Sequence, residues 1–423
     1  MIASFDPSVI LKDLFFEAIT AANPEKCLPH NLPLQPRGKT LVVGAGKASG
    51  MMAKVVEEQW NSEISGLVIT PYGYGVNCNR IEIIEGGHPL PDSAGLRAAR
   101  RIYQLVQKLD PHSTIIALFS GGGSSLLTMP ANNITLAEKR EVNLSLLRSG
   151  ATIKEINCVR KHLSKIKGGQ LAKVARCTRI ITLAISDVAG NDLSAIASGP
   201  TVPDNSTYRD ARQILHNYKV KLPKAVSEYL EAAEEETPKL GDPIFDNNEI
   251  HIIATPSESL SAAAKLGKKL GFTVFSLGDK IEGEAHIVGK KHAQLALTCK
   301  IGQGPVAPPC ILLSGGETTV TVNGQGCGGP NTEYLMGLMF ELQGAHGIYS
   351  IACDTDGIDG TKDNAGALVF PDTLTRAEKL NIDPRVFLER NDSFSFFSKL
   401  GDLVYTGPTF TNVNDFRALV ICP

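Results

Sequence analysis

The sequence has no excess of charge, no closely spaced cysteine pair and no long apolar run, and each absence excludes a class of protein. Its 42 basic and 44 acidic residues give a net charge of −2, so no basic surface for nucleic acid or an anionic membrane is expected. No apolar run reaches the about 18 residues of a membrane span. The nine cysteines form no C-x-x-C pair, which indicates reduced thiols in a cytoplasmic protein and argues against a disulfide framework or zinc site.

The length predicts more than one domain. The 423 residues exceed the about 250 that one hydrophobic core usually serves, so two domains are expected. Residues 1–24 alternate apolar and polar side chains with helical spacing and lack the basic start of a signal peptide, so they predict a helix. Residues 230–248 are acidic and irregular, which places the domain boundary there, after residue 236.

Short apolar segments alternate with amphipathic ones, which predicts a parallel sheet with helices on both faces in the first domain. The strands expected there are 39–43, 66–70, 81–84, 114–119 and 180–185, and the later helices are 92–109, 136–148 and 152–174. In the second domain the expected strands are 251–254, 273–276, 310–313, 318–322 and 349–353, with helices at 258–270 and 287–296. The hairpin-like pair 310–313 and 318–322 predicts a mixed second sheet.

The segment from Ser120 to Ser125 is the main candidate for a binding site. It reads Ser-Gly-Gly-Gly-Ser-Ser and directly follows the apolar strand predicted at 114–119. Consecutive glycines leave backbone N–H groups uncovered, which suits an anion, and a helix beginning near Ser124 would add partial positive charge. A tight turn without a ligand is the alternative. Ligands of parallel sheets lie at the carboxyl ends of the strands, where this segment falls.

A second glycine turn, Gly44-Ala-Gly46-Lys47, follows the strand at 39–43. It begins like a dinucleotide-binding fingerprint, but Ser49 occupies the position of the third glycine. Lys47 would place an ammonium group beside a helix N-terminus, which is unfavourable unless an anion lies between them. The alternative for Lys47 is a solvated surface lysine.

Carboxylates follow other predicted strands. Asp187 and Asp192 come after the strand at 180–185, where they suit Mg²⁺, although Asp192 could instead cap the next helix. In the second domain an acidic loop at 354–359 could hold another metal or a substrate hydroxyl, and the segments 314–317 and 326–333 are further candidate anion-binding turns.

These motifs, in this order from about residue 8 to the C-terminus, resemble the glycerate kinase family, which includes proteins labelled hydroxypyruvate reductase in tartrate degradation. The matching segments are 43–47, 87–89, 119–125, 157–161, 167–169, 186–188, 196–201, 314–317, 355–360, 391–393 and 411–413.

The resemblance implies a two-domain α/β fold, with an N-terminal doubly wound, Rossmann-like parallel sheet and a C-terminal domain with a mixed sheet. Residues 1–236, joined by a returning tail at about 405–423, would form the first domain, and residues 237–404 the second. A cleft between them would bind ATP, Mg²⁺ and D-glycerate and produce 2-phosphoglycerate. These small molecules are the only expected partners, and a homodimer is left open.

The resemblance also assigns roles to individual residues. Lys47, Arg160 and Asp187 would be catalytic, with Lys47 neutralising phosphate charge and Arg160 pairing with the glycerate carboxylate or the transferred phosphoryl group. Asp187 and Asp192 would hold Mg²⁺. The residues assigned to ATP are Gly44, Gly46, Ser120, Gly121, Gly122, Gly123, Ser124, Ser125, Gly315, Gly316, Glu317, Asn331, Glu333 and Asp356.

The sequence departs from the family at three places. Cys327 and Pro330 stand where relatives usually carry a basic residue, so one cation expected to stabilise the transition state is absent. Asn191 replaces a common aspartate and Asp354 a common glycine, so the metal ligands could be redistributed. Two alternatives to a kinase are an NAD(P)H-dependent hydroxypyruvate reductase and a catalytically weak protein that binds glycerate or a nucleotide. The incomplete dinucleotide fingerprint argues against the reductase.

Overall fold

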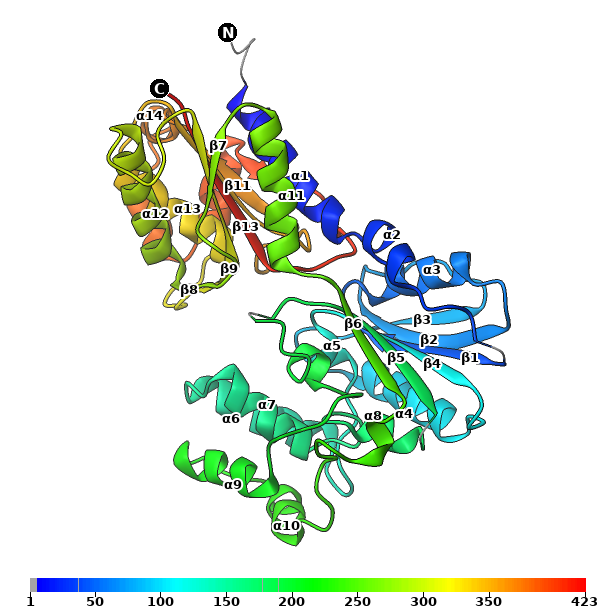
Figure 1. The fold of residues 1–423 in the computed structure, drawn as a ribbon. Helices are drawn as coiled ribbons and strands as arrows, with labels where there is room; N and C mark the ends of the chain where they lie inside the picture. Colours follow the sequence, from blue (N-terminus) through cyan, green and yellow to red (C-terminus); the bar gives the residue numbers. More distant parts are fainter. Residues whose placement is uncertain (1–5, 37, 177, 189) are drawn as a thin grey trace. The chain divides into compact units, whose positions relative to one another are not determined.

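The computed structural model describes residues 6–36, 38–176, 178–188 and 190–423, so Cys177, one of the nine cysteines, lies outside the described residues. The chain forms two compact units, each with its own sheet (Figure 1). The inserted unit is Cys27–Ile253, and the terminal unit combines the chain up to Lys26 with Ala254–Pro423.

The inserted unit is built on a six-stranded sheet in the order β3-β2-β1-β4-β5-β6. Pairing is parallel from β3 to β5, which confirms the predicted doubly wound sheet. Every residue of β1 and β4 is buried, as expected for central strands with helices on both faces. The strands are β1 (Thr40–Ala45), β2 (Ile64–Pro71), β3 (Ile81–Gly86), β4 (Thr114–Phe119), β5 (Arg179–Ile185) and β6 (Asn248–Ala254).

Helices cover both faces of this sheet, and a further group has a core of its own. Helix α3 lies on one face, and α4, α5 and α8 lie on the other (Figure 1). The group α6, α7, α9 and α10 packs around Val142, Val159, Leu215 and Leu230. The helices of this unit are α3 (Ser49–Gln59), α4 (Ser93–Gln107), α5 (Gly123–Leu126), α6 (Leu136–Arg148), α7 (Ile153–His162), α8 (Gln170–Val174), α9 (Tyr208–Asn217) and α10 (Lys224–Ala232), with 3-10 helices η1 (Pro29–Asn31), η2 (Ile196–Ser198) and η3 (Pro243–Phe245). The short helix α2 (Pro24–Cys27) contains the boundary between the units, at 26/27.

The predicted helical stretch 152–174 is interrupted. Helix α7 ends at His162 and α8 begins at Gln170. Gly168 and Gly169 between them have φ angles of +56° and +79°, which a continuous right-handed helix does not contain.

The terminal unit contains a mixed sheet in the order β12-β11-β10-β13-β9-β7, and β8 also pairs with β9. Strands β7 and β8 run parallel to β9, and the pairs from β9 to β12 are antiparallel, so the predicted mixed sheet is confirmed. The strands are β7 (Thr273–Ser276), β8 (Ile281–Glu284), β9 (Cys310–Thr319), β10 (Ile348–Asp354), β11 (Gly366–Val369), β12 (Leu403–Val404) and β13 (Asp415–Ile421).

The predicted hairpin of 310–313 and 318–322 is wrong, because β9 continues through the two glycines between these segments. Its first half pairs with β7 and its second half with β8. At Gly316 the φ angle is +115°, and an added Cβ would lie 2.3 Å from the carbonyl oxygen of Ile281. The two glycines therefore allow β8 to approach β9 closely and do not form a turn.

Two layers of helices enclose the terminal sheet. Helices α1 and α11 cover one face, where the Phe15 and Phe416 ring centroids are 5.7 Å apart, and α12 and α13 cover the other. The helices are α1 (Pro7–Ala22), α11 (Pro256–Lys269), α12 (Ala285–Lys300), α13 (Pro330–Leu342), α14 (Thr373–Lys379), α15 (Pro384–Glu389) and α16 (Ser393–Leu400). Among the described helices, none has both the length and the apolar character needed to cross a bilayer.

The domain boundaries predicted from the sequence need correction. The predicted return of residues 405–423 to the first domain is wrong, because β13 lies between β10 and β9 of the terminal unit. Helix α1 also belongs to the terminal unit, and β6 belongs to the inserted one, so the boundary lies at 253/254 and not after 236. Each error concerns packing between distant segments, which local composition does not report.

Candidate functional site

The two glycine turns predicted from the sequence lie together in the inserted unit. Strands β1 and β4 are neighbours, so the turns that follow them share one sheet edge. The Lys47 N–H donates to the Gly121 carbonyl at 2.8 Å, and the Ala48 N–H donates to Ser120 Oγ at 3.0 Å. Lys47 itself is half-buried, immediately before α3. The predicted placement of both turns at the carboxyl ends of strands is confirmed, and their binding of a ligand stays a prediction.

Glycine is needed in these turns because the backbones approach closely. An added Cβ at Gly46, whose φ is +148°, would lie 2.1 Å from Ser120 Oγ, and one at Gly123 would lie 2.6 Å from the Ala45 carbonyl oxygen. Helix α5, which starts at Gly123, has only four residues, so its dipole is much smaller than a full helix would supply.

The serines of the turn connect it to two other loops. Ser125 Oγ lies 2.8 Å from Nδ1 of His88, which follows β3. Ser124 Oγ lies 2.8 Å from Ser198 Oγ, and the Ser198 hydroxyl in turn donates to Asn157 Oδ1 at 3.4 Å. The turn is thereby held from both sides by polar side chains.

Lys167 lies directly beneath the turn. Its Nζ donates to the Ser124 carbonyl at 2.7 Å and to the Ala197 carbonyl at 3.4 Å, and the side chain is 1 % exposed. Burial, followed by the charges of Lys139 and Arg160, lowers its pKa well below the ordinary value. Lys167 belongs to the segment 167–169, which resembles the glycerate kinase family, but no role in the site was predicted for it.

Arg160 and Lys139 complete a cluster of three cations with Lys167. Arg160 donates to Asn157 Oδ1 at 3.5 Å and is largely buried, which lowers its pKa. Lys139 is 2 % exposed, and its Nζ has no hydrogen-bond partner among the described residues. Burial and then the charge of Arg160 lower the pKa of Lys139 to about 7.

The cation cluster, defined as Lys139, Arg160 and Lys167, has no protein anion to balance it. Within the described ranges, no carboxylate lies at ion-pair distance from any of the three. By contrast, the neighbouring buried Lys161 pairs with Asp204 at 3.2 Å. Buried charges are normally paired, so a like-charged cluster is the expected signature of an anion-binding site.

Lys139 was not among the site residues predicted from the sequence, although its spacing from apolar residues indicates that it is buried. Lys139 precedes Val142 by three residues and Leu146 by seven, which places it on the apolar face of α6. A lysine within an apolar stripe is unusual, because such a side chain is rarely buried without a partner.

The predicted magnesium ligands follow β5. Phe119 of β4 pairs with Ala184 of β5, so Asp187 emerges at the same sheet edge as the glycine turns. Asp187 is half-buried, and Asp192 is exposed. Asp192 Oδ1 accepts from the Ser194 N–H at 2.9 Å within the turn before η2, whose N-cap residue is Ala195 and which has no side-chain capping bond, so the capping alternative for Asp192 is wrong.

The remaining predicted residues belong to the terminal unit. Gly315 and Gly316 lie inside β9, opposite Phe416 and Asp415, so the segment 314–317 is part of a strand and the predicted turn is wrong, whereas contact of these glycines with ATP stays a prediction. Glu317 is an exposed residue of the same strand. The close approach of the Ile281 backbone requires glycine at position 316.

The other three of these residues have contacts within the terminal unit. Asn331 Nδ2 donates to Asp415 Oδ1 at 2.6 Å, and Glu333 Oε2 accepts from Asn391 Nδ2 at 3.1 Å. Asp356 is 2 % exposed and accepts from the Ile358 N–H at 2.8 Å. That they and Glu317 contact ATP stays a prediction.

The acidic loop at 354–359 has a structural role at one of its carboxylates. Asp359 accepts from the N–H groups of Asn331 and Thr332 at 2.9 and 2.8 Å, and from Thr332 Oγ1 at 2.7 Å. It thus caps the first turn of α13. Burial raises the pKa of Asp359 to about 6.

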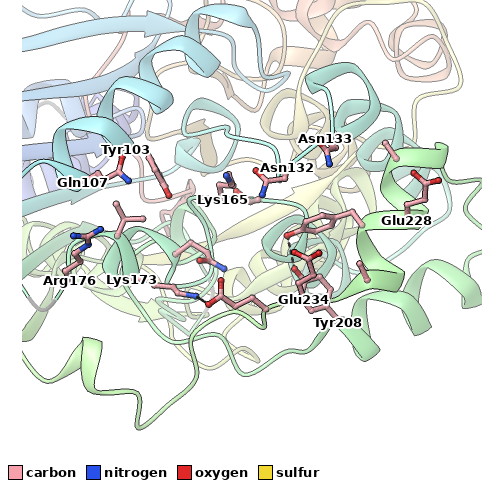
Figure 2. Close-up of a pocket in the computed structure, with 17 residues that line it drawn as sticks. Tyr103, Gln107, Asn132, Asn133, Lys165, Lys173, Arg176, Tyr208, Glu228 and Glu234 are labelled. Carbon is pink, nitrogen blue, oxygen red and sulfur yellow. Dashed lines mark hydrogen bonds and ion pairs between the residues drawn. The ribbon is translucent and has the colours of Figure 1, made fainter.

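A separate cavity of about 590 Å³ lies among α4, α8 and α10 (Figure 2). Side chains of both charge signs line it, including Lys165, Arg176 and Glu234, and an ion pair joins Lys173 to Glu235. None of the site residues predicted from the sequence lines this cavity. Cavity volume therefore does not identify the strand-end site.

Known proteins resemble this chain over nearly its whole length. Residues 10–231 match the family described as "Domain of unknown function (DUF4147)", and residues 310–415 match the MOFRL family. An Agrobacterium vitis protein provisionally named a hydroxypyruvate reductase is 49 % identical over 97 % of this chain and 94 % of its own length. A Thermotoga maritima protein named D-glycerate 2-kinase is 37 % identical over 97 % of this chain and 98 % of its own. A crystal structure of glycerate kinase from Thermotoga maritima superposes with a TM-score of 0.88 at 36 % identity, covering 98 % of this chain and 100 % of that one.

Proposed function

The chain belongs to the glycerate kinase family, and from this membership we propose that it transfers a phosphoryl group from ATP to D-glycerate and releases 2-phosphoglycerate. The relatives named as glycerate kinases align over nearly the full chain, so both units of the fold are shared.

The observation that supports this proposal best is the cation cluster beside the glycine turn. Without a ligand, Lys139, Arg160 and Lys167 repel one another and lack hydration. A phosphate group carries more than one negative charge and several acceptor oxygens, so its binding would offset both costs. We therefore assign the anionic groups of the substrates to this cluster and to the turn above it.

Each predicted residue then receives a role. The turn at 121–125 would hold phosphate oxygens through N–H groups other than those of Gly123 and Ser125, which donate to the Ser120 and Gly122 carbonyls, and Lys47 would neutralise the phosphate charge. Arg160 can grip a carboxylate or the transferred phosphoryl group through two parallel N–H donors. Lys167 fixes the turn through the Ser124 carbonyl, which makes it a positioning residue as well as a charge.

Asp187 and Asp192 offer the oxygen donors that Mg²⁺ prefers. The ion takes one or two carboxylates and completes its coordination with phosphate oxygens and water, which fits two carboxylates on the loop after β5. When bound, Mg²⁺ neutralises phosphate charge and orients the transferred group. The chain's own cations do the rest by positioning the reactants and stabilising developing charge. A cytoplasmic location, a role in tartrate degradation, a homodimer and closure of the two units over the substrates stay predictions.

A second candidate function comes from the name of the 49 % identical relative, hydroxypyruvate reductase. The turn after β1 lacks the third glycine of a dinucleotide fingerprint, since Ser49 occupies its place. Steady NADH oxidation with hydroxypyruvate and without ATP would support the reductase. Multiple turnovers of ATP that require glycerate would exclude both the reductase and a non-enzymatic binding protein.

The decisive experiment is a coupled ADP-release assay with glycerate, tartronate, hydroxypyruvate and lactate, followed by phosphorus NMR of the product. We expect glycerate to be the preferred substrate and the phosphate to appear on its 2-hydroxyl. Lys47→Ala should lower kcat/KM by on the order of 10²–10³. Activity of Lys47→Ala within threefold of wild type would contradict its assigned role.

Matched lysine variants test the cation cluster separately. Lys139→Met and Lys167→Met each remove one buried charge, whereas Lys165→Met removes a lysine that lines the cavity of Figure 2. The first two should weaken ATP-induced or phosphoglycerate-induced thermal stabilisation, and the third should leave it intact. Equal ligand-induced stabilisation in all three variants would refute the assignment of an anion to the cluster.

A further inference from the structure

A second cluster of ionisable side chains lies in the terminal unit, where β8, α12 and α13 meet. Strand β8 ends at Glu284 and leads directly into α12, which carries His286 in its first turn. Glu333 lies in the first turn of α13 and is 3 % exposed. The two helices approach closely at Gly337, where an added Cβ would lie 2.0 Å from the His286 carbonyl oxygen.

This close helix contact brings three potential ligand atoms together. His286 Nδ1 lies 3.5 Å from Glu333 Oε1 and 3.8 Å from Glu284 Oε1, and one potential ligand atom of each residue lies within 4.8 Å of those of the other two. Both separations exceed the about 3.2 Å limit of a good N–H···O hydrogen bond. His286 Nδ1 therefore has no hydrogen-bond partner among the described residues, although the atom is buried.

The carboxylates are oriented by partners on other segments. Asn391 Nδ2 donates to Glu333 Oε2 at 3.1 Å, which leaves Oε1 directed at His286. The Thr321 N–H and hydroxyl donate to Glu284 Oε1 and Oε2 at 2.9 and 3.0 Å. Outer hydrogen bonds of this kind are typical of carboxylates that bind metal ions. Glu284 is also the residue that precedes α12, yet its side chain makes no capping bond to that helix.

We propose that Glu284, His286 and Glu333 bind one divalent transition-metal ion of the Zn²⁺ or Co²⁺ type. Ligands about 2.0–2.2 Å from a shared tetrahedral ion lie roughly 3.3–3.6 Å apart, close to the two measured separations. One imidazole nitrogen with two carboxylate oxygens suits these borderline metals, and water would complete the coordination. The ion would tie β8, α12 and α13 together, so its primary effect is on the stability of the terminal unit. Glu333 is also one of the residues predicted to contact ATP, so metal binding is tested without nucleotide and with variants of Glu284 and His286.

The test measures binding of Zn²⁺ and Co²⁺ to full-length protein that has been treated with a chelator and desalted. Wild type should bind one equivalent, melt a few degrees higher with Zn²⁺, and give visible Co²⁺ absorption bands typical of low coordination number. His286→Ala and Glu284→Gln should lose these three signals. His346→Ala, which removes an exposed histidine of the same unit, should retain them.

Circular dichroism of each variant without metal separates loss of the site from loss of the fold. A folded His286→Ala protein that binds one equivalent with wild-type affinity would overturn the proposal. So would wild-type protein that shows no saturable binding of either metal at millimolar concentration. If a variant is unfolded, the Co²⁺ spectrum of the wild-type protein still tests the proposal. Co²⁺ bound only to scattered surface carboxylates stays six-coordinate and absorbs weakly, so a weak spectrum would overturn the proposal.

Discussion

Among single residues, Lys139 combines features that a stable protein usually avoids. It is 2 % exposed, it lacks a hydrogen-bond partner among the described residues, and burial together with the charge of Arg160 lowers its pKa. Such a group destabilises the ligand-free fold whenever it is protonated. Its presence on α6 is understandable if the folded state normally binds an anion there.

The pKa of Lys139 predicts a specific pH dependence. It is about 7 in the folded protein, against 10.5 as the ordinary value for the unfolded chain. Between these values the unfolded chain holds a proton that the folded protein lacks, so the free energy of unfolding rises with pH. Lys139→Met should reduce this slope by up to about 1.4 kcal/mol per pH unit.

The measurement is urea unfolding at pH 7, 8 and 9 without nucleotide, with Lys165→Met as the control. Identical pH dependence in wild type and Lys139→Met would contradict the lowered pKa.

Among single residues, those of the two glycine turns were easier to predict from the sequence than the buried lysines of the cation cluster. Ser120–Ser125 and Lys47 are recognisable because a buried strand followed by glycines is a local pattern. Burial of Lys139 and Lys167 depends instead on how α6 and the loop before α8 pack, and a single sequence does not report that packing.

Among the elements, β9 is the one whose glycines were misinterpreted. Two adjacent glycines normally indicate a turn, but here they lie within a ten-residue strand. The reason is nonlocal, since the Ile281 backbone of β8 occupies the space that a side chain at position 316 would need. Strand β1 likewise runs two residues past its predicted end, to Ala45, because Gly44 lies directly against Leu118 of β4, whereas β4 ends at Phe119 as predicted.

Gly316→Ala should therefore be strongly destabilising. The substitution combines a φ of +115° with a Cβ 2.3 Å from the Ile281 oxygen, and we expect a loss of roughly 3 kcal/mol or more. Gly401→Ala is the matched control, because its φ is +75° but nothing lies within 4 Å of the added Cβ. It should cost about 1 kcal/mol. Denaturant unfolding that gives equal losses for the two variants would rule out the close approach of β8.

Helix α13 depends on a cap that comes from a distant loop. Asp359 accepts two first-turn N–H groups and one hydroxyl, so Asp359→Ala leaves three donors without their acceptor. We expect the free energy of unfolding to fall by about 2–4 kcal/mol.

Asp363→Ala removes an exposed carboxylate from the same region and should change stability by less than about 0.5 kcal/mol. Thermal unfolding distinguishes these outcomes. If Asp359→Ala were as stable as Asp363→Ala, the carboxylate would have a role other than capping.

At the scale of the whole molecule, the N-terminal and C-terminal parts of the sequence pack together in the terminal unit. Phe15 of α1 is fully buried and packs against Phe416 of β13, whereas the adjacent Phe16 is 45 % exposed. Phe15→Ala should destabilise the terminal unit by about 3–5 kcal/mol, and Phe16→Ala by much less.

Two probes locate the effect. The sole tryptophan, Trp60, is buried in the inserted unit, so its fluorescence reports that unit, and circular dichroism reports the whole chain. Phe15→Ala should produce an early loss of ellipticity at low urea. Equal midpoints for Phe15→Ala and Phe16→Ala would contradict the packing of α1 in the terminal unit.

The fold class was predictable at this scale, but the division of the chain was not. Strands alternate with helices in two series along the chain, and each series predicts one α/β sheet. The assignment of α1, β6 and β13 depends on pairing across hundreds of residues, and composition changes at residues 230–248 only mark an acidic surface segment.

The position of β13 has a consequence for synthesis. This strand lies in the middle of the terminal sheet, and it is synthesised long after α1, which packs against it. At translation rates of about 5–20 residues per second, α1 waits roughly 20–80 s for Phe416, with its apolar face unprotected. The inserted unit is complete once β6 has emerged, long before. During this interval the nascent chain carries a folded inserted unit and an exposed apolar face on α1, which makes α1 the natural binding place for a chaperone.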